Sequence, residues 1–247
     1  MKWNWQQPDW PEFRWDGTSL AASEARFLQQ SGILIGSAKH LADDDRAAVT
    51  IDIMTGEALK TSEIEGELLD RDSVQSSLRR QFGFEVGDCR IPPAERGIAE
   101  MMIGLYRDFA EPVTDDTLSV WHRMVVSGRH DIGVVGSYRE HANAMQVVSG
   151  FSHKPKVHFE APPSQDVPLE MQSFLAWFAA TSPEGTRPLP GLTRAGIAHL
   201  YFVSIHPFED GNGRVARALA EKVLSQAIGQ PSLIALSHVI QRKGGAY

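Results

Sequence analysis

The most informative stretch of the sequence is His206-Pro207-Phe208-Glu209-Asp210-Gly211-Asn212-Gly213-Arg214-Val215-Ala216-Arg217. A Gly-Asn-Gly turn that runs into a helix points unpaired backbone N–H groups, and the positive end of the helix dipole, at an anion. Arg214 and Arg217 are three residues apart, so both guanidinium groups lie on one helix face and can reach successive phosphates. The stretch therefore predicts a binding site for a polyphosphate.

Two further side chains of this stretch suit chemistry on a phosphate. Asp210 can ligate Mg²⁺, which prefers one or two carboxylates together with phosphate oxygens and water. His206 precedes the turn, where an imidazole can take a proton from an incoming hydroxyl. The structural alternative is a loop-to-helix junction, in which the glycines serve geometry, Asp210 caps the helix and the arginines are solvated. The mutual consistency of the roles favours the phosphate site.

The same stretch resembles the signature of the Fic family, HPFx[DE]GNGRxxR, and fills every specified position. The resemblance implies a mainly α fold, the Fic-fold helical bundle with a small β-hairpin flap. It also implies a nucleotidyltransferase: a Mg²⁺-dependent protein adenylyltransferase. Such an enzyme moves AMP from ATP to a Ser, Thr or Tyr hydroxyl of a target protein (AMPylation) and releases pyrophosphate.

The resemblance also gives each residue of the signature a role. His206 would be the catalytic base, and Asp210 would hold Mg²⁺ between the phosphates. Backbone N–H groups at the turn would stabilise the α- and β-phosphates, and the arginines would bind the β- and γ-phosphates. The residues implied to contact ATP are Gly211, Asn212, Gly213, Arg214 and Arg217.

A second pattern, Thr61-Ser62-Glu63-Ile64-Glu65-Gly66, fits the inhibitory motif [S/T]xxxE[G/N] of Fic proteins. The resemblance implies autoinhibition by a helix that precedes the catalytic domain and carries Thr61, Glu65 and Gly66. Glu65 would pair with Arg217 and block the place of the nucleotide γ-phosphate, since a carboxylate and a phosphate compete for the same donors. The local alternative is an S-x-x-E capping box, in which Ser62 and Glu65 begin a helix without any regulatory role.

The composition is that of an ordinary globular protein. The chain has 247 residues, of which 42% are hydrophobic and 22% charged, enough for one large domain or for a core with an appendage. The formal net charge of −7 argues against direct nucleic-acid binding, which depends on clustered positive charge. The single cysteine, Cys89, cannot form an internal disulfide, and we interpret it as a packing residue.

Neither a membrane segment nor a targeting segment is predicted. No apolar run approaches the roughly 20 residues that span a bilayer. The opening Met1-Lys2-Trp3-Asn4-Trp5-Gln6 lacks the apolar region of a signal peptide. We therefore expect a cytoplasmic protein without membrane contacts.

The expected organisation has two parts. Residues 1–89 form an N-terminal aromatic segment and helices that carry the inhibitory motif, and residues 90–247 form the Fic catalytic core. The first part holds Trp3, Trp5, Trp10 and Trp15, which we expect to pack onto a neighbouring surface; a peptide-binding groove is the alternative. The run 236–247 resembles the family helix that helps to wall the nucleoside pocket, beyond which many members continue.

Hydrophobic periodicity and capping residues predict the helices. Residues 128–165 are β-prone and interrupted by glycines, which predicts a small hairpin with loops. The expected helices cover 19–41, a segment from Asp43 to a break near Thr55-Gly56, then 61–69, 93–109, 115–127, 167–180, 193–205 and 213–228.

The hairpin region, about 136–150, resembles the flap with which Fic proteins hold a target segment by main-chain pairing. The implied partner is a target protein with a hydroxyl side chain, and a homodimer is expected only by analogy. One alternative uses the same site to remove AMP, or to transfer UMP or phosphocholine. Another is a catalytically silent regulatory or interaction module, in which Glu65 never leaves. The intact His206 and Asp210 argue against that last alternative.

Overall fold

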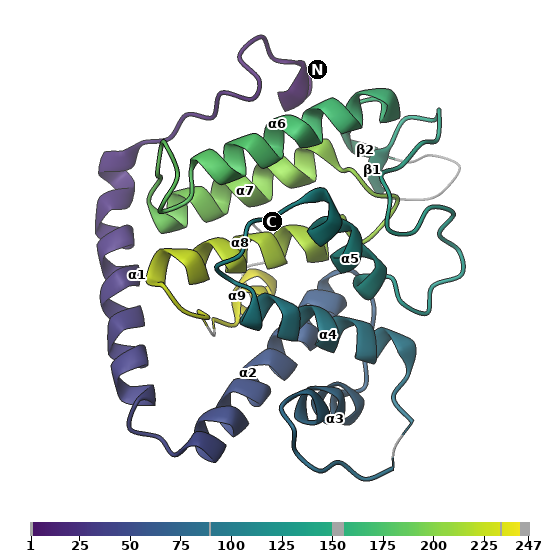
Figure 1. Ribbon diagram of the computed structural model, residues 1–247. Helices are drawn as coiled ribbons and strands as arrows, with labels where there is room; N and C mark the ends of the chain where they lie inside the picture. Colours follow the sequence, from purple (N-terminus) through teal and green to yellow (C-terminus); the bar gives the residue numbers. More distant parts are fainter. Residues whose placement is uncertain (1, 89, 150–155, 233, 243–247) are drawn as a thin grey trace.

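The computed structural model describes residues 2–88, 90–149, 156–232 and 234–242. These residues form nine α-helices and one two-stranded sheet (Figure 1). The predicted mainly α fold with a small hairpin is therefore confirmed. The helices are α1 Gly17–Ala38, α2 Asp43–Ile64, α3 Arg71–Gln81, α4 Pro93–Arg107, α5 Asp115–Val125, α6 Val167–Ala180, α7 Gly191–Ile205, α8 Asn212–Ile228 and α9 Leu236–Arg242, with short 3₁₀ helices at Asn4–Gln6 and Ser164–Asp166.

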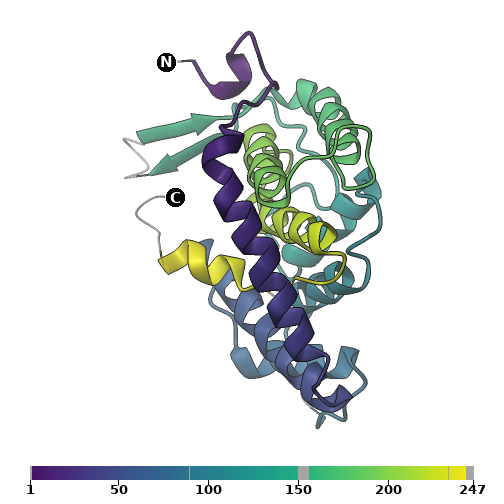
Figure 2. The ribbon, with the colours of Figure 1, turned by 90° about the vertical axis from the view of Figure 1, so that its left-hand side faces the viewer.

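The pair α7 and α8 lies at the centre of the bundle. The stripe Val215, Leu219 and Val223 of α8 is buried, as the i, i+4, i+8 spacing predicts. Most of the other residues of α8 are buried too, because α1, α2, α4, α5, α7 and α9 all contact this helix. Figure 2 shows α1 crossing the outside of the bundle. The signature stretch therefore leads directly into the most enclosed helix of the fold.

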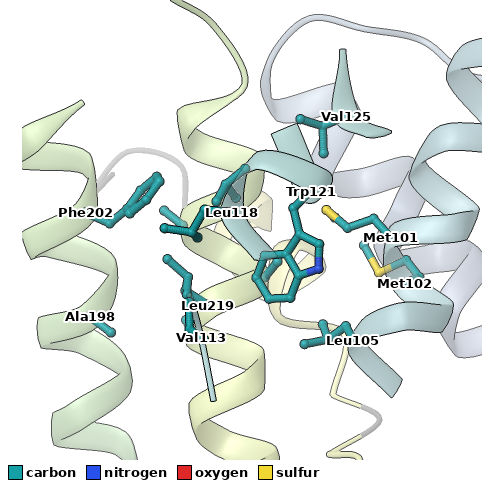
Figure 3. Close-up of a cluster of buried hydrophobic side chains, with 14 of the residues drawn as sticks. Met101, Met102, Leu105, Val113, Leu118, Trp121, Val125, Ala198, Phe202 and Leu219 are labelled. Carbon is teal, nitrogen blue, oxygen red and sulfur yellow. The ribbon is translucent and has the colours of Figure 1, made fainter. Parts of the chain in front are cut away.

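The core between α4, α5 and α8 is built around a buried tryptophan. Trp121 of α5 lies among Met101, Met102 and Leu105 of α4, close to Leu219 of α8 (Figure 3). Thr114 caps α5 by accepting the backbone N–H of Thr117. This packing fixes α5 and the loop that follows it beside the start of α8.

The close approach of α4 and α5 depends on Gly97. A Cβ at this position would lie 2.1 Å from the backbone oxygen of Met124 and 2.9 Å from Cβ of Ser127. We expect Gly97→Ala to lower the free energy of unfolding by about 1–3 kcal/mol, since an overpacked core must shift its backbone. Urea denaturation measures the change.

The control for Gly97→Ala lies on the same helix. Gly104 has nothing within 4 Å of an added Cβ, so Gly104→Ala should raise stability by about 0.4–1 kcal/mol through reduced chain entropy. Equal stabilities of the two variants would show that the contact between α4 and α5 is not tight.

The predicted break near Thr55-Gly56 is wrong, because α2 continues to Ile64. The hydroxyl of Thr55 donates to the carbonyl oxygen of Ile51 at 2.7 Å, inside the helix, and Gly56 has open space around it. Glu57, one residue on, is buried and accepts both the backbone N–H and the hydroxyl of Ser237 in α9. Contacts with α3, α4 and α9 thus outweigh the weak local propensity.

The end of α2 also overturns the capping-box alternative. Ser62 lies in the last turn, Glu65 is the C-cap, and Gly66 has φ +81°. The backbone N–H of Glu67 donates to the carbonyl of Ser62 at 3.0 Å, which closes the turn in the manner of a glycine C-cap. A helix therefore ends, and does not begin, at the inhibitory motif.

Helix α3 was not predicted from the sequence. It is strongly polar, and only Val74 and Leu78 supply buried apolar side chains, one turn apart. Asp70 caps its start by accepting the N–H of Ser73 at 2.8 Å. The predicted domain boundary at 89/90 falls in the connection from α3 to α4. Cys89, with its expected packing role, lies outside the described residues.

Three of the four N-terminal tryptophans pack onto a neighbouring surface of the protein, as expected. Trp3 contacts the ring of Phe159, the indole N–H of Trp5 donates to the carbonyl of Glu160, and Trp10 packs edge-on against Tyr201 of α7. Trp15 stays exposed and lines a cavity of about 510 Å³ with side chains of α6 and α7. The segment therefore holds the sheet and α7 together.

The hairpin consists of β1, Gln146–Ser149, and β2, Lys156–Glu160, paired antiparallel with an irregularity between Val147 and Val148. The range predicted for the flap, 136–150, covers β1 but not β2, and Gly150 lies outside the described residues. Val134-Val135 does not form a strand, since Glu209 takes the backbone N–H groups of Gly133 and Val134. Among the residues that the structure describes, no helix has the length and apolar character needed to cross a bilayer.

Candidate active site

His206 stands at the C-terminus of α7 in an unusual backbone conformation. Its φ of 52° and ψ of 59° place it in the left-handed region, which disfavours most side chains other than glycine. Its Nδ1 atom lies 3.3 Å from the carbonyl oxygen of Val203. A carbonyl only accepts, so Nδ1 carries the hydrogen and Nε2 presents its lone pair. Burial lowers the pKa of His206, which favours the neutral imidazole that a base requires.

The loop after His206 is anchored by Phe208. This ring is 1% exposed and stacks on His122 of α5 with centroids 4.1 Å apart. The side-chain amide of Asn212 donates to the carbonyl of Phe208 and accepts its N–H, at 2.9 and 3.0 Å. Burial lowers the pKa of His122 to about 4, and its Nδ1 accepts the N–H of Gly136 at 2.9 Å. The stacking of Phe208 on His122 and its hydrogen bonds with Asn212 therefore hold the loop in place.

The first turn of α8 presents backbone N–H groups that favour an anion. Gly211 is its N-cap, with φ +76°, and among the described residues no side chain caps the helix. A Cβ at Gly211 would lie 2.9 Å from Cγ2 of Val125, so the turn needs glycine for both conformation and space. The first backbone N–H groups of α8 thus face the position at which an anion is favoured.

Arg217 is held by the predicted inhibitory motif. Its Nε donates to Oγ1 of Thr61 at 2.7 Å, and its Nη2 donates to the Thr61 carbonyl at 2.8 Å and to Oε1 of Glu65 at 2.7 Å. The contact of Arg217 with Glu65 therefore uses one nitrogen of the guanidinium. Thr61 takes the remaining donors of that side of the guanidinium.

The carboxylate of Glu65 also lies against the start of α8. A Cβ added to Gly213 would come within 2.1 Å of Oε1 of Glu65. Gly213 therefore leaves room for the carboxylate beside the first helical turn, where an anion interacts with the helix dipole. An acidic oxygen of the chain occupies the place that the sequence predicts for a phosphate.

Arg214 has a carboxylate partner of its own, which sequence reasoning missed. Its Nη1 donates to Oε2 of Glu67, and its side chain is 3% exposed. Its Nε is buried and has no hydrogen-bond partner among the described residues. A buried donor without a partner is costly, and the oxygen of a phosphate would satisfy it.

Asp210 contacts the chain through both of its carboxylate oxygens. Oδ1 accepts the N–H of Gly211 at 2.6 Å, and Oδ2 accepts from Nη1 of Arg129 at 2.9 Å. Arg129 is held in turn by Asp131. Within the described ranges, no cluster of three or more His, Cys, Asp or Glu side chains can hold a metal ion. The donor set fits Mg²⁺ only when a nucleotide supplies further oxygens and Arg129 has moved aside.

The sequence profile of the Fic/DOC family matches residues 112–224, which include this entire loop and most of α8. The chain belongs to the Fic/DOC family. A profile described as a domain of unknown function, DUF4172, matches residues 3–84. The Fic signature lies in the segment that the Fic/DOC profile matches, and the predicted inhibitory motif lies in the segment that the DUF4172 profile matches. The two segments meet in space at Arg214 and Arg217.

Two proteins named protein adenylyltransferase Fic illustrate the sequence likeness. The one from Nematostella vectensis is 33% identical over 125 residues, which cover 51% of this chain and 26% of that protein. The one from Drosophila melanogaster is 40% identical over 73 residues, which cover 30% of this chain and 14% of that protein. The match therefore spans about a quarter or less of the length of these relatives.

Two solved structures share the fold. A Fic family protein from Desulfovibrio desulfuricans G20 has a TM-score of 0.65 at 23% identity, covering 98% of this chain and 66% of that one. A Fic domain containing signaling protein from Bacteroides thetaiotaomicron VPI-5482 has a TM-score of 0.59 at 23% identity, covering 81% of this chain and 72% of that one. At this identity, the likeness concerns the fold.

The structure brings the predicted site residues of this Fic protein together at the start of α8. His206 and the Asp210–Arg217 stretch meet the end of α2 with Thr61, Glu65 and Gly66. The residues that sequence reasoning missed lie in contact with this group: Glu67, Arg129 and Arg139. Only Glu67 carried a local signal, because it follows the inhibitory motif directly.

Proposed function

We propose that this Fic protein is an autoinhibited protein adenylyltransferase that transfers AMP from ATP to a hydroxyl of a target protein. The observation that carries the proposal is the carboxylate of Glu65, which lies beside Gly213 and on Arg217. It occupies an anion position built from a helix start and a buried guanidinium. Removal of this carboxylate would expose a site for the tail of a triphosphate.

The reaction follows from the groups that surround this position. Nε2 of His206 takes the proton of a Ser, Thr or Tyr hydroxyl as its oxygen attacks the α-phosphorus. The bond between that phosphorus and the pyrophosphate oxygen breaks, and the negative charge of the leaving group is stabilised by Arg214, Arg217 and the backbone N–H groups of α8. Asp210 would hold Mg²⁺, which supplies charge neutralisation when bound. The protein contributes mainly positioning and fixed charge.

The named relatives support the choice of donor. Both proteins with sequence likeness carry the name protein adenylyltransferase, and the signature region lies within the matched family profile. The target segment would dock along the β1–β2 hairpin by main-chain pairing, since the side chains of β1 face solvent. A homodimer remains a proposal by analogy.

Intact mass spectrometry tests the proposal. The Glu65→Gly variant is incubated with Mg²⁺ and, in separate reactions, with ATP, UTP, CTP or CDP-choline. We expect self-modification by the mass of one AMP residue, with ATP as the best donor. Modification with UTP or CDP-choline but not with ATP would show that the transferred group is UMP or phosphocholine and not AMP. Release of AMP from a modified protein, faster in wild type than in Glu65→Gly, would indicate removal. No modification with any donor would indicate the silent module.

Glu67 should contribute a second block at the same site. Because Glu67 is paired with the buried Arg214, a nucleotide must displace this carboxylate too. We expect Glu65→Gly/Glu67→Gln to bind ATP about threefold to tenfold more tightly than Glu65→Gly alone, as measured by isothermal titration calorimetry. The modest size reflects the exchange of one charged hydrogen bond for another.

The matched control for Glu67 is Glu63, which pairs with Lys60 at 2.6 Å and does not contact Arg214 in the described structure. Glu63→Gln should leave the ATP affinity of Glu65→Gly unchanged. An unchanged affinity in the Glu67 variant as well would show that the contact with Arg214 does not oppose the nucleotide.

A further inference from the structure

Arg139 is a buried arginine that contacts the backbone of His206, the proposed base. Its side chain is 1% exposed. Its Nε donates to the carbonyl of His206 at 2.7 Å, and its backbone N–H donates to the carbonyl of Pro207 at 2.9 Å. Its Nη2 reaches the carbonyl of Ile205 at 3.3 Å. One residue thus binds three consecutive carbonyls around His206.

The other contacts of Arg139 tie this loop to the segment after the hairpin. Nη2 donates to the carbonyl of Pro162 at 2.6 Å, and Nη1 donates to Oγ of Ser164 at 2.8 Å. Among the described residues, no carboxylate lies within ion-pair distance of the guanidinium, and burial lowers its pKa to about 10. A buried cation satisfied only by neutral carbonyls and one hydroxyl is expensive to keep, so a plain packing role is a weak explanation.

Two of the carbonyls that Arg139 binds, those of Ile205 and His206, are among the groups that α7 leaves unsatisfied at its C-terminus. A positive charge at this end is favourable, because it opposes the negative end of the helix dipole. Here it also holds a non-glycine residue in the left-handed region, a conformation that costs about 1–2 kcal/mol. Without these bonds, the backbone of His206 is free to relax toward an ordinary helix end, and the imidazole turns away with it.

We infer that Arg139 is a positioning residue for His206, which fixes the left-handed backbone and thereby directs Nε2 at the attacking hydroxyl. The inference rests on the proposed function only for the identity of the reaction. The contacts that fix His206 come from the structure itself. Arg139 touches no substrate in this account and acts only through His206.

A second effect of Arg139 is electrostatic. The charged groups that act on His206 are Arg139, which disfavours imidazolium, and Glu65 and Asp210, which favour it. Removal of the Arg139 cation should therefore raise the pKa of His206, because a nearby like charge is lost. The acid limb of the rate profile should therefore move to higher pH.

The fold offers a matched control in Arg194. This residue is also 1% exposed, and it binds the carbonyl of Phe178, the hydroxyl of Thr181 and the side chain of Gln226. It closes the C-terminus of α6 with the same chemistry. Among the described residues, it makes no hydrogen bond or ion pair with the His206 loop, so Arg194→Met tests the general cost of losing a buried arginine.

The experiment compares Arg139→Met, Arg139→Lys and Arg194→Met, each in the Glu65→Gly background. The rate of self-modification is measured by intact mass at saturating ATP, together with the ATP concentration of half-maximal rate and the folded fraction. We expect Arg139→Met to lose at least about tenfold in saturated rate, with the half-maximal ATP concentration changed less than about twofold. Arg139→Lys should recover part of the rate, and Arg194→Met should keep it after correction for folding.

Nitrogen NMR on histidine-labelled protein gives a readout independent of activity. The His206 signal, assigned by its loss in His206→Ala, should report hydrogen on Nδ1 in Glu65→Gly and a mixture of tautomers in Arg139→Met. Equal losses of rate in the Arg139 and Arg194 variants, with an unchanged His206 tautomer, would reduce Arg139 to a core residue. An inactive Glu65→Gly would refute the proposed function, and the NMR comparison would still decide the role of Arg139.

Discussion

Replacing Glu65 with glycine should raise the rate of AMP transfer at limiting ATP by about tenfold to a hundredfold. The Glu65 carboxylate lies on Arg217 at 2.7 Å and beside Gly213, so a nucleotide must displace it before the γ-phosphate can bind. A charge-assisted hydrogen bond contributes about 1.5–3 kcal/mol, and each 1.4 kcal/mol is a factor of ten. Gly66, the left-handed glycine that follows the C-cap, is unchanged, so the helix end should survive the change.

This gain is measured by incorporation of label from ATP labelled at the α-phosphate, with ATP labelled at the γ-phosphate as the control for the transferred group. Glu63→Gly is the matched variant, because it removes a carboxylate from the same turn whose partner is Lys60. It should leave the rate at the wild-type value. Equal labelling of wild type and Glu65→Gly would remove the inhibitory role from this contact.

Replacing His206 with alanine in the Glu65→Gly background should lower the transfer rate by about 10²–10⁴-fold, the usual contribution of a positioned general base. ATP affinity should change little, since the proposed function assigns phosphate binding to α8 and its arginines. Because burial lowers the pKa of His206, the imidazole is neutral at pH 7. The rate of Glu65→Gly should fall only when the pH drops below that lowered pKa.

The control for His206 is the exposed His130, in the loop after α5. His130→Ala should retain the rate of Glu65→Gly, because it removes an imidazole without touching the signature loop. Labelling that persists in Glu65→Gly/His206→Ala at the rate of its parent would exclude His206 as the base.

The central part of the fold was predictable because its signals are local and repeated. Thr114 caps α5, and the spacing of Val215, Leu219 and Val223 gave α8. The polar α3 escaped prediction, since Val74 and Leu78 supply only two apolar positions. The false break in α2 came from Gly56, where long-range contacts decide the outcome and local propensity does not.

The site was predictable where one short segment carries its chemistry. His206, Asp210 and Arg217 lie within the signature, and Glu65 within a six-residue motif. Arg129 and Arg139 were not predictable as site residues, because they reach Asp210 and His206 from the loop between α5 and β1, 81 and 67 residues away in sequence. Their roles follow from tertiary contacts, and neither has a distinctive neighbouring pattern.

The most direct test is a crystal structure of Glu65→Gly soaked with a non-hydrolysable ATP analogue and Mg²⁺. We predict that the terminal phosphates lie against the first N–H groups of α8 and on Arg214 and Arg217. We also predict Mg²⁺ on Asp210, with Arg129 displaced. Phosphates bound elsewhere, or a helix start still filled by side chains of the protein itself, would contradict the proposed function.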